Sequence, residues 1–203
     1  MVHILEELEI LRSTRRPEKK KRYEEFAYIL DFLSEGYPSD PRPRHLREPI
    51  IQAIGESFFT LLELIVKRNQ NLKLFDRIQI GRGDRNVVNH VKRRLKADDL
   101  TFTAKSELSN AIKLILEKRE SEIIEFFNSA VPITPRMHQL ELLPGIGKKN
   151  MWRIIDERKK APFVDYSDLS KRCGISDPSK KILDRILTEL EGNEKYHIFT
   201  RPE

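Results

Sequence analysis

The chain has 203 residues, of which 38% are hydrophobic and 34% are charged. This balance argues against a disordered chain, and no apolar run reaches the roughly 20 residues that cross a bilayer. The single cysteine, Cys173, excludes an internal disulfide and any zinc or iron–sulfur site built from several cysteines. We therefore expect a cytoplasmic protein with no metal, no cofactor and no membrane partner.

The charge balance favours a polyanionic partner. The 38 lysines and arginines outnumber the 32 acids, which gives a net charge of +6. Residues 12–22 carry seven bases against one acid, and residues 81–96 carry six bases against one acid. The candidate nucleic-acid contacts in the second of these segments are Arg82, Arg85, Lys92, Arg93 and Arg94.

The N-terminal half combines a basic segment with strand-like stretches. Residues 1–22 are rich in charge and poor in apolar side chains, which predicts a flexible N-terminal segment. The stretch from Gly36 to His45 contains three prolines and is predicted to be a long loop between the first two strands. The predicted strands are 26–33, 49–56, 58–67, 76–81 and 87–96, the last of which also fits a helical pattern.

Five short strands ending in a basic one suggest a small OB-like β-barrel over residues 23–98. Barrels of this kind bind single strands by stacking bases on aromatic side chains beside a basic groove. Strand alternation places Phe26 and Tyr28 on one face, and Tyr28 is the stacking candidate. Residues 99–130 then show helical periodicity, which predicts a helical connector.

The third region, residues 131–203, contains the stretch LLPGIGKKNMW. Its pattern predicts a helix over Met137–Leu143, a turn at Gly145–Gly147 and a second helix over Lys148–Arg158. We expect one glycine to supply a positive φ and the other to remove a Cβ where the backbone approaches a ligand. The free N–H groups at the start of the second helix would bind a phosphate. The candidate contacts are Gly145, Ile146, Gly147, Lys148, Lys149 and Arg153.

A weaker copy of this pattern follows downstream. A helix from Tyr166, a turn over Cys173–Ser176 and a last helix from Asp177 through Leu190 are predicted. The candidate contacts in this copy are Gly174, Ser176, Lys180 and Lys181.

The first copy resembles the helix-hairpin-helix motif through Leu143, Gly145, Ile146, Gly147 and Lys148, although Met151 stands where that motif usually has a small residue. The two copies together resemble a paired helix-hairpin-helix domain, which would be all-α. The chain as a whole is therefore predicted to be a multi-domain α+β protein, with an OB-like barrel, a helical connector and this C-terminal domain.

Several longer stretches resemble one protein family. From Tyr23 to Arg201, the stretches YEEFAYILDF, IQIGRGDR, PITPRMHQLELLPGIGKKNMW and KYHIFTR resemble the archaeal domain of unknown function 655 family. The resemblance implies an OB-like domain joined to a paired hairpin domain, and a nucleic-acid binder for which RNA is favoured over DNA. Members encoded near ribosomal and rRNA-modifying genes imply ribosomal RNA as a target, with ribosomal or RNA-processing proteins as candidate partners.

Two other classes of function remain open at this point. Asp165 follows Gly147 at a distance similar to that of the catalytic aspartate in hairpin-containing DNA glycosylases, although capping of the next helix is the favoured role. Glu157-Arg158-Lys159 resembles a nuclease triplet without its further acids, so no catalytic residue is assigned. A protein-docking adaptor is the second alternative. The favoured interpretation is a non-enzymatic nucleic-acid-binding protein.

Overall fold

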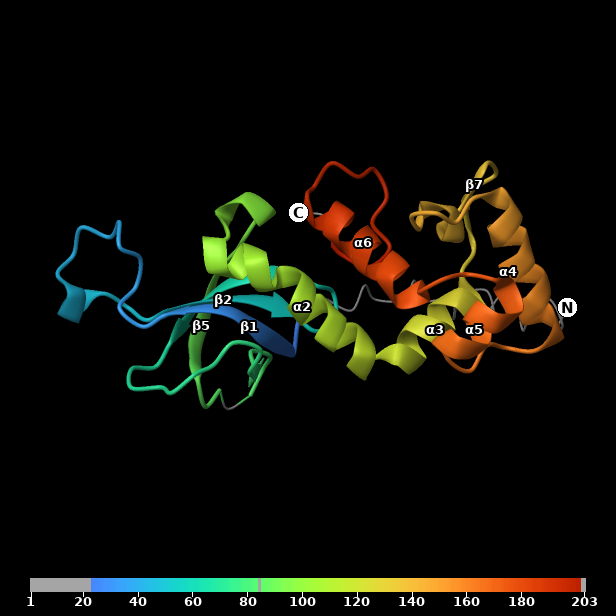
Figure 1. The fold of residues 1–203 in the computed structure, drawn as a ribbon. Coiled ribbons are helices and arrows are strands. Elements are labelled where there is room, and N and C mark those ends of the chain that lie inside the picture. The colour runs from blue at the N-terminus through green and yellow to red at the C-terminus, as the bar shows by residue number, and fades with distance from the viewer. Residues whose placement is uncertain (1–22, 84, 202–203) are drawn as a thin grey trace, which may run out of the picture.

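The computed structural model describes residues 23–83 and 85–201, so the basic segment predicted for residues 1–22 lies outside the described residues (Figure 1). The N-terminal half forms an antiparallel sheet in the order β4-β1-β2-β3-β5. All five predicted strand segments are confirmed, including the ambiguous fifth one. The strands are β1 (Phe26–Leu33), β2 (Ile50–Gly55), β3 (Leu61–Val66), β4 (Arg77–Gln79) and β5 (Val88–Arg94).

The predicted OB-like barrel is wrong, because the sheet is an open, curled half-barrel. The edge strands β4 and β5 do not pair with each other within the described part of the chain. The three residues of β4 pair with β1 over Phe26–Tyr28, and backbone hydrogen bonds of Phe75 and Asp76 with Ile29 continue this contact. Closure is also unnecessary for burial, because every residue of β2 and β3 is already buried.

Each face of the sheet has its own apolar cluster. Tyr28 and Leu30 of β1 belong to one cluster, whereas Ala27 and Ile29 belong to the other. This matches the alternation of side chains along a strand. The near-continuous apolar runs of β2 and β3 are typical of strands that are buried on both faces.

Two helices follow the sheet, as the sequence predicts. A 3-10 turn, η2 (Ala97–Asp99), leads into α2 (Phe102–Lys118), and α3 (Glu120–Ser129) comes next. The Thr101 hydroxyl caps α2 by accepting a 3.1 Å hydrogen bond from the Ala104 N–H. In Figure 1, α2 crosses the sheet and α3 continues toward the far end of an elongated molecule.

The C-terminal region is not the predicted all-α domain of paired helix-hairpin-helix motifs. It begins with a two-stranded antiparallel sheet and a 3-10 turn and continues with three helices. Its elements are β6 (Pro132–Thr134), β7 (Met137–His138), η3 (Gln139–Leu142), α4 (Lys148–Lys160), α5 (Tyr166–Cys173) and α6 (Pro178–Leu190).

The helix predicted over Met137–Leu143 is therefore wrong, and local chemistry explains why. His138 makes a capping box with Glu141, whose carboxylate accepts a 2.9 Å hydrogen bond from the His138 N–H. This box starts the helical turn only at Gln139. Pro144 then disfavours helical φ/ψ at Leu143, so the helix ends after a single turn.

One apolar cluster runs from the sheet through α2 into the C-terminal helices. It includes Tyr28 and Leu61 of the sheet and Ile112 of α2. It also includes Ile154 of α4 and Ile186 of α6. Arg201, the last described residue, lies beside the connection between β2 and β3, where its guanidinium is 3.8 Å from the ring centroid of Phe58. The domain boundaries given above stay a prediction.

A further 3-10 turn, η1 (Arg44–Leu46), overlaps the end of the proline-rich loop that was predicted between the first two strands.

Candidate nucleic-acid interface

The first turn, Pro144–Gly147, contains the turn predicted over Gly145–Gly147, and one of its glycines has the expected positive φ. Gly145 has φ +76°, a conformation that favours glycine. The Ile146 side chain is buried in the core, and its N–H donates a 3.0 Å hydrogen bond to the Leu143 carbonyl. These contacts hold the turn in one conformation ahead of α4.

Gly147 is the N-cap of α4 and has an ordinary φ of −83°. A Cβ added there would meet no other described atom within 4 Å. Neither conformation nor packing within the described residues therefore requires glycine at this position. No described side chain caps α4, and its first turn contains no acid. Glycine thus leaves the N-terminal N–H groups of α4 open to an approaching anion.

Three lysines surround this helix end. Lys148 and Lys149 are exposed in the first turn of α4. Lys181 comes from α6, and its Nζ donates a 3.2 Å hydrogen bond to the Pro144 carbonyl oxygen. Helices far apart in sequence therefore bring cationic side chains to one turn.

The second turn, Gly174–Asp177, differs from the first at the start of its helix. Gly174 ends α5 with φ +66°, and a Cβ there would lie 3.2 Å from Nη1 of Arg153. The Asp177 carboxylate caps α6 by accepting a 2.9 Å hydrogen bond from the Lys180 N–H. The Lys180 ammonium itself lies 3.2 Å from Asp184. A carboxylate of the chain therefore already occupies this helix end, which distinguishes it from the N-terminus of α4.

Lys92 and Arg93 of β5 have a structural role that the sequence did not predict. They lie 2.6 Å and 3.3 Å from the carboxylate of Glu63, which is buried in β3. Burial acts to raise the pKa of Glu63, but hydrogen bonds from Lys92 and Tyr37 offset that effect and hold the pKa below its usual value. The signal was present as a lone acid within the apolar run LLELIV.

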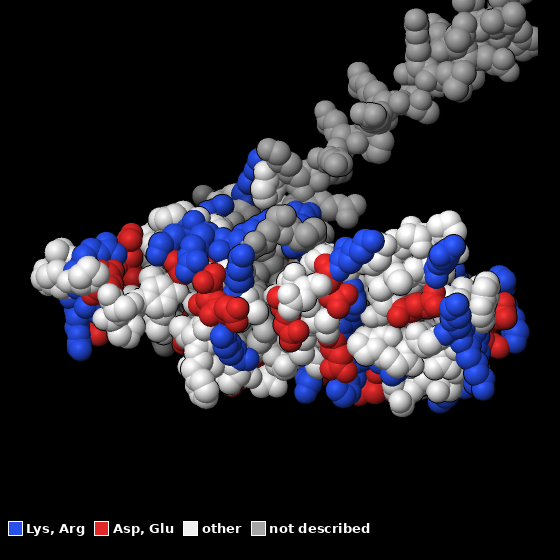
Figure 2. All heavy atoms as spheres, turned by 90° about the horizontal axis from the view of Figure 1, so that it is seen from above, with Lys and Arg blue, Asp and Glu red and all other residues white. Residues whose placement is uncertain are grey.

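The remaining sheet candidates do not form one site with the first turn. Arg85 donates from Nε to the Gly81 carbonyl at 3.0 Å, and Arg82 lies 5.8 Å from the ring centroid of Tyr23. Arg94 is exposed at the end of β5. Figure 1 places β5 and α4 in opposite halves of the molecule, and Figure 2 shows basic side chains over both halves.

The prediction that Tyr28 stacks on a base is wrong. Its side chain is fully buried beneath α2, and its hydroxyl donates a 3.2 Å hydrogen bond to Glu56. The Lys118 ammonium donates to the same hydroxyl, also at 3.2 Å. A helix covers Tyr28, and the Arg77 guanidinium lies over the ring of Phe26, which strand alternation alone could not show.

Trp152 is an exposed aromatic side chain that was not among the residues predicted from the sequence. It lies on α4 with 57% of its surface exposed, although tryptophan is usually well buried. The buried face of α4 is formed by Met151, Ile154 and Ile155. Their spacing in KKNMWRII is the signal that could have placed Trp152 on the outer face.

Asp165 has the capping role that was predicted for it. Its carboxylate accepts a 2.7 Å hydrogen bond from the Asp168 N–H at the start of α5. Among the described residues, no group of three or more histidines, cysteines or acids is placed to hold a metal ion. Within the same part of the chain, no helix combines the length and the apolar character needed to cross a membrane.

Comparisons with known proteins identify a family and two similar archaeal proteins. A family model described as "Protein of unknown function (DUF655)" matches residues 23–201. The uncharacterised protein MJ0038 of Methanocaldococcus jannaschii is 41% identical over 191 residues, which cover 92% of this chain and 85% of that protein. The crystal structure of Af1531 from Archaeoglobus fulgidus, described with the same family model, is 48% identical with a TM-score of 0.80. That comparison covers 88% of this chain and 100% of the Af1531 chain.

Proposed function

The chain belongs to the DUF655 family, whose description assigns no activity, and we therefore propose a function from the first turn: the protein binds nucleic acid by holding a backbone phosphate at the N-terminus of α4. The observation that carries this proposal is Gly147. It leaves open space in front of uncapped N–H groups, and nothing else among the described residues requires a glycine there. A helix N-terminus favours an anion through these N–H groups and through the helix dipole.

The charges around the turn support the same partner. Lys148, Lys149 and Lys181 place three ammonium groups about one helix end, and no acid lies in the first turn of α4. A docking adaptor would instead call for an apolar patch over Gly145. The Lys181 ammonium lies there, 2.9 Å from the position of a Cβ built on Gly145.

Contacts of this kind grip the backbone and carry no sequence information. The protein is thus a non-enzymatic binder with little base preference at the first turn. RNA, and ribosomal RNA in particular, is the proposed target on the family resemblance alone. Binding assays with RNA and DNA of the same sequence separate the two.

The proposal is tested by replacing Gly147 with aspartate. A carboxylate at the N-cap would accept the same N–H groups that a phosphate needs, as Asp177 does at α6. We expect Gly147→Asp to keep or slightly raise the melting temperature while weakening binding roughly tenfold or more, the value of one lost charge-assisted hydrogen bond.

Ser167→Asp is the matched control, because it makes the same charge change in the exposed first turn of α5. Fluorescence anisotropy with labelled oligonucleotides measures the affinities of both variants. A folded Gly147→Asp variant that binds as tightly as the wild type would overturn the proposal.

A further inference from the structure

Trp152 is a large apolar side chain that α4 leaves on the surface. It is the only tryptophan in the chain, and its 57% exposure contrasts with the buried Met151, Ile154 and Ile155 on the opposite side of the helix. The Trp152 side chain therefore contributes little to the hydrophobic core. Exposure of an indole costs apolar free energy that a bound partner would recover.

The position of Trp152 on α4 indicates the chemistry of that partner. Lys149 and Lys148 precede it by three and four residues, which places both lysines on the same helix face. Helical side chains tilt toward the N-terminus, so the indole covers the turn that carries these two lysines. An aromatic ring beside two cations is complementary to a nucleotide, because a nucleotide carries a flat base and a negatively charged phosphate on the same sugar.

We infer that Trp152 is a stacking platform for an unpaired base of the nucleic acid whose phosphate lies at the first turn. Bases inside a duplex are stacked on their neighbours and do not present a free face to a protein surface. The preferred ligand is therefore a single strand, a loop or a bulge. This inference rests on the proposed function and adds strandedness to it.

The sole tryptophan makes the test direct. Single-stranded and duplex oligonucleotides of the same sequence are titrated into the full chain while tryptophan fluorescence and the anisotropy of a labelled oligonucleotide are recorded together. We expect the single strand to quench Trp152 in step with binding. We expect Trp152→Ala to weaken single-strand binding by about 5- to 150-fold, whereas Trp152→Phe retains most of the affinity.

Phe102→Ala is the control, since Phe102 is 89% exposed at the start of α2 beside the sheet, and its removal should change neither signal. Anisotropy that reports binding without quenching, together with a Trp152→Ala variant as tight as the wild type, would overturn the stacking role and leave the proposed function intact. Equal quenching by duplex would overturn the requirement for an unpaired base. Absence of all binding would remove both proposals.

Discussion

The Lys181 ammonium of α6 donates a hydrogen bond to the Pro144 carbonyl of the first turn, 3.2 Å away and 37 residues earlier in the chain. The opposite contact also exists, because the Arg153 guanidinium of α4 lies against Gly174 of the second turn. Each of the two turns is thus covered by a basic side chain from the helix that follows the other turn. The two turns differ at the helix N-cap, which is Gly147 in one case and Asp177 in the other.

This relationship predicts how binding depends on salt. Each phosphate that is neutralised on a single strand contributes roughly −0.7 to the slope of log affinity against log salt. Lys181 uses one of its three donors on Pro144, and two remain for a phosphate at the first turn. We expect Lys181→Ala to make the slope shallower by about 0.7.

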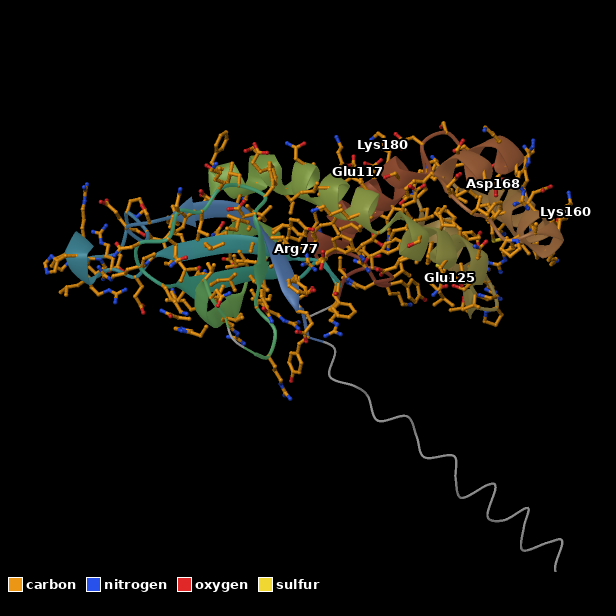
Figure 3. All side chains as sticks on the ribbon, turned by 90° about the horizontal axis from the view of Figure 1, so that it is seen from below. Arg77, Glu117, Glu125, Lys160, Asp168 and Lys180 are labelled. Carbon is orange, nitrogen blue, oxygen red and sulfur yellow. The ribbon has the colours of Figure 1, made fainter. Side chains whose placement is uncertain are left out.

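The neighbouring Lys180→Ala is the matched control for this measurement. Lys180, labelled in Figure 3, forms an ion pair with Asp184, so its removal should change the slope much less. Anisotropy titrations at several salt concentrations give both slopes. Equal slopes for the wild type and Lys181→Ala would show that this lysine does not contact the phosphate.

The regular elements were predictable where one local signal dominated. Alternation and apolar runs located all five strands, and Asp177-Pro178 correctly opened α6. The predictions of the barrel and of the Met137–Leu143 helix were wrong because each sequence pattern is compatible with two structures. LLELIV fits a strand of a closed barrel and a strand of an open sheet, and only whether the edge strands β4 and β5 pair with each other decides between them. The apolar residues of Met137–Leu143 suit a helix, yet the His138 capping box and Pro144 confine it to one turn.

The candidate site divides in the same way. That one glycine of the turn has a positive φ follows from the sequence of the turn itself, whereas the open surroundings of Gly147 depend on how the neighbouring elements pack. The placement of Lys181 at that turn depends on how α6 packs, which no local pattern encodes. The sequence predicts Lys92 as a nucleic-acid contact from its charge alone. Its ion pair with the buried Glu63 depends on the pairing of β3 with β5, which the sequence does not show.

Glu63 gives a prediction for acid stability. Its pKa is lowered in the folded protein, so the stability that it contributes is present above its ordinary value of 4.5 and is lost as pH falls through the lowered pKa. Glu63→Gln removes that titration, leaves Lys92 without its carboxylate partner and leaves Arg93 paired with Asp99 alone. We expect the variant to be less stable than the wild type at neutral pH and to lose less stability on acidification.

Urea unfolding of both proteins at neutral pH and below pH 4 measures the two differences. Asp40 and Glu56 also have lowered pKa values, but both proteins share them, so their effects cancel in the comparison. The same loss of stability in both proteins on acidification would mean that Glu63 is not the group responsible.

Variants of Asp165 distinguish a binding protein from an enzyme. Because its carboxylate caps α5 through the Asp168 N–H, asparagine should replace it with little loss of stability, whereas alanine should cost about 1 kcal/mol. We expect Asp165→Asn and Asp165→Ala to bind nucleic acid as the wild type does, with only the alanine variant melting earlier. Wild-type protein incubated with damaged duplex DNA, flap DNA or structured RNA, with and without magnesium, should show no cleavage. Turnover by the wild type that Asp165→Asn abolishes would instead identify this carboxylate as catalytic, because a cap that asparagine restores cannot account for such a loss.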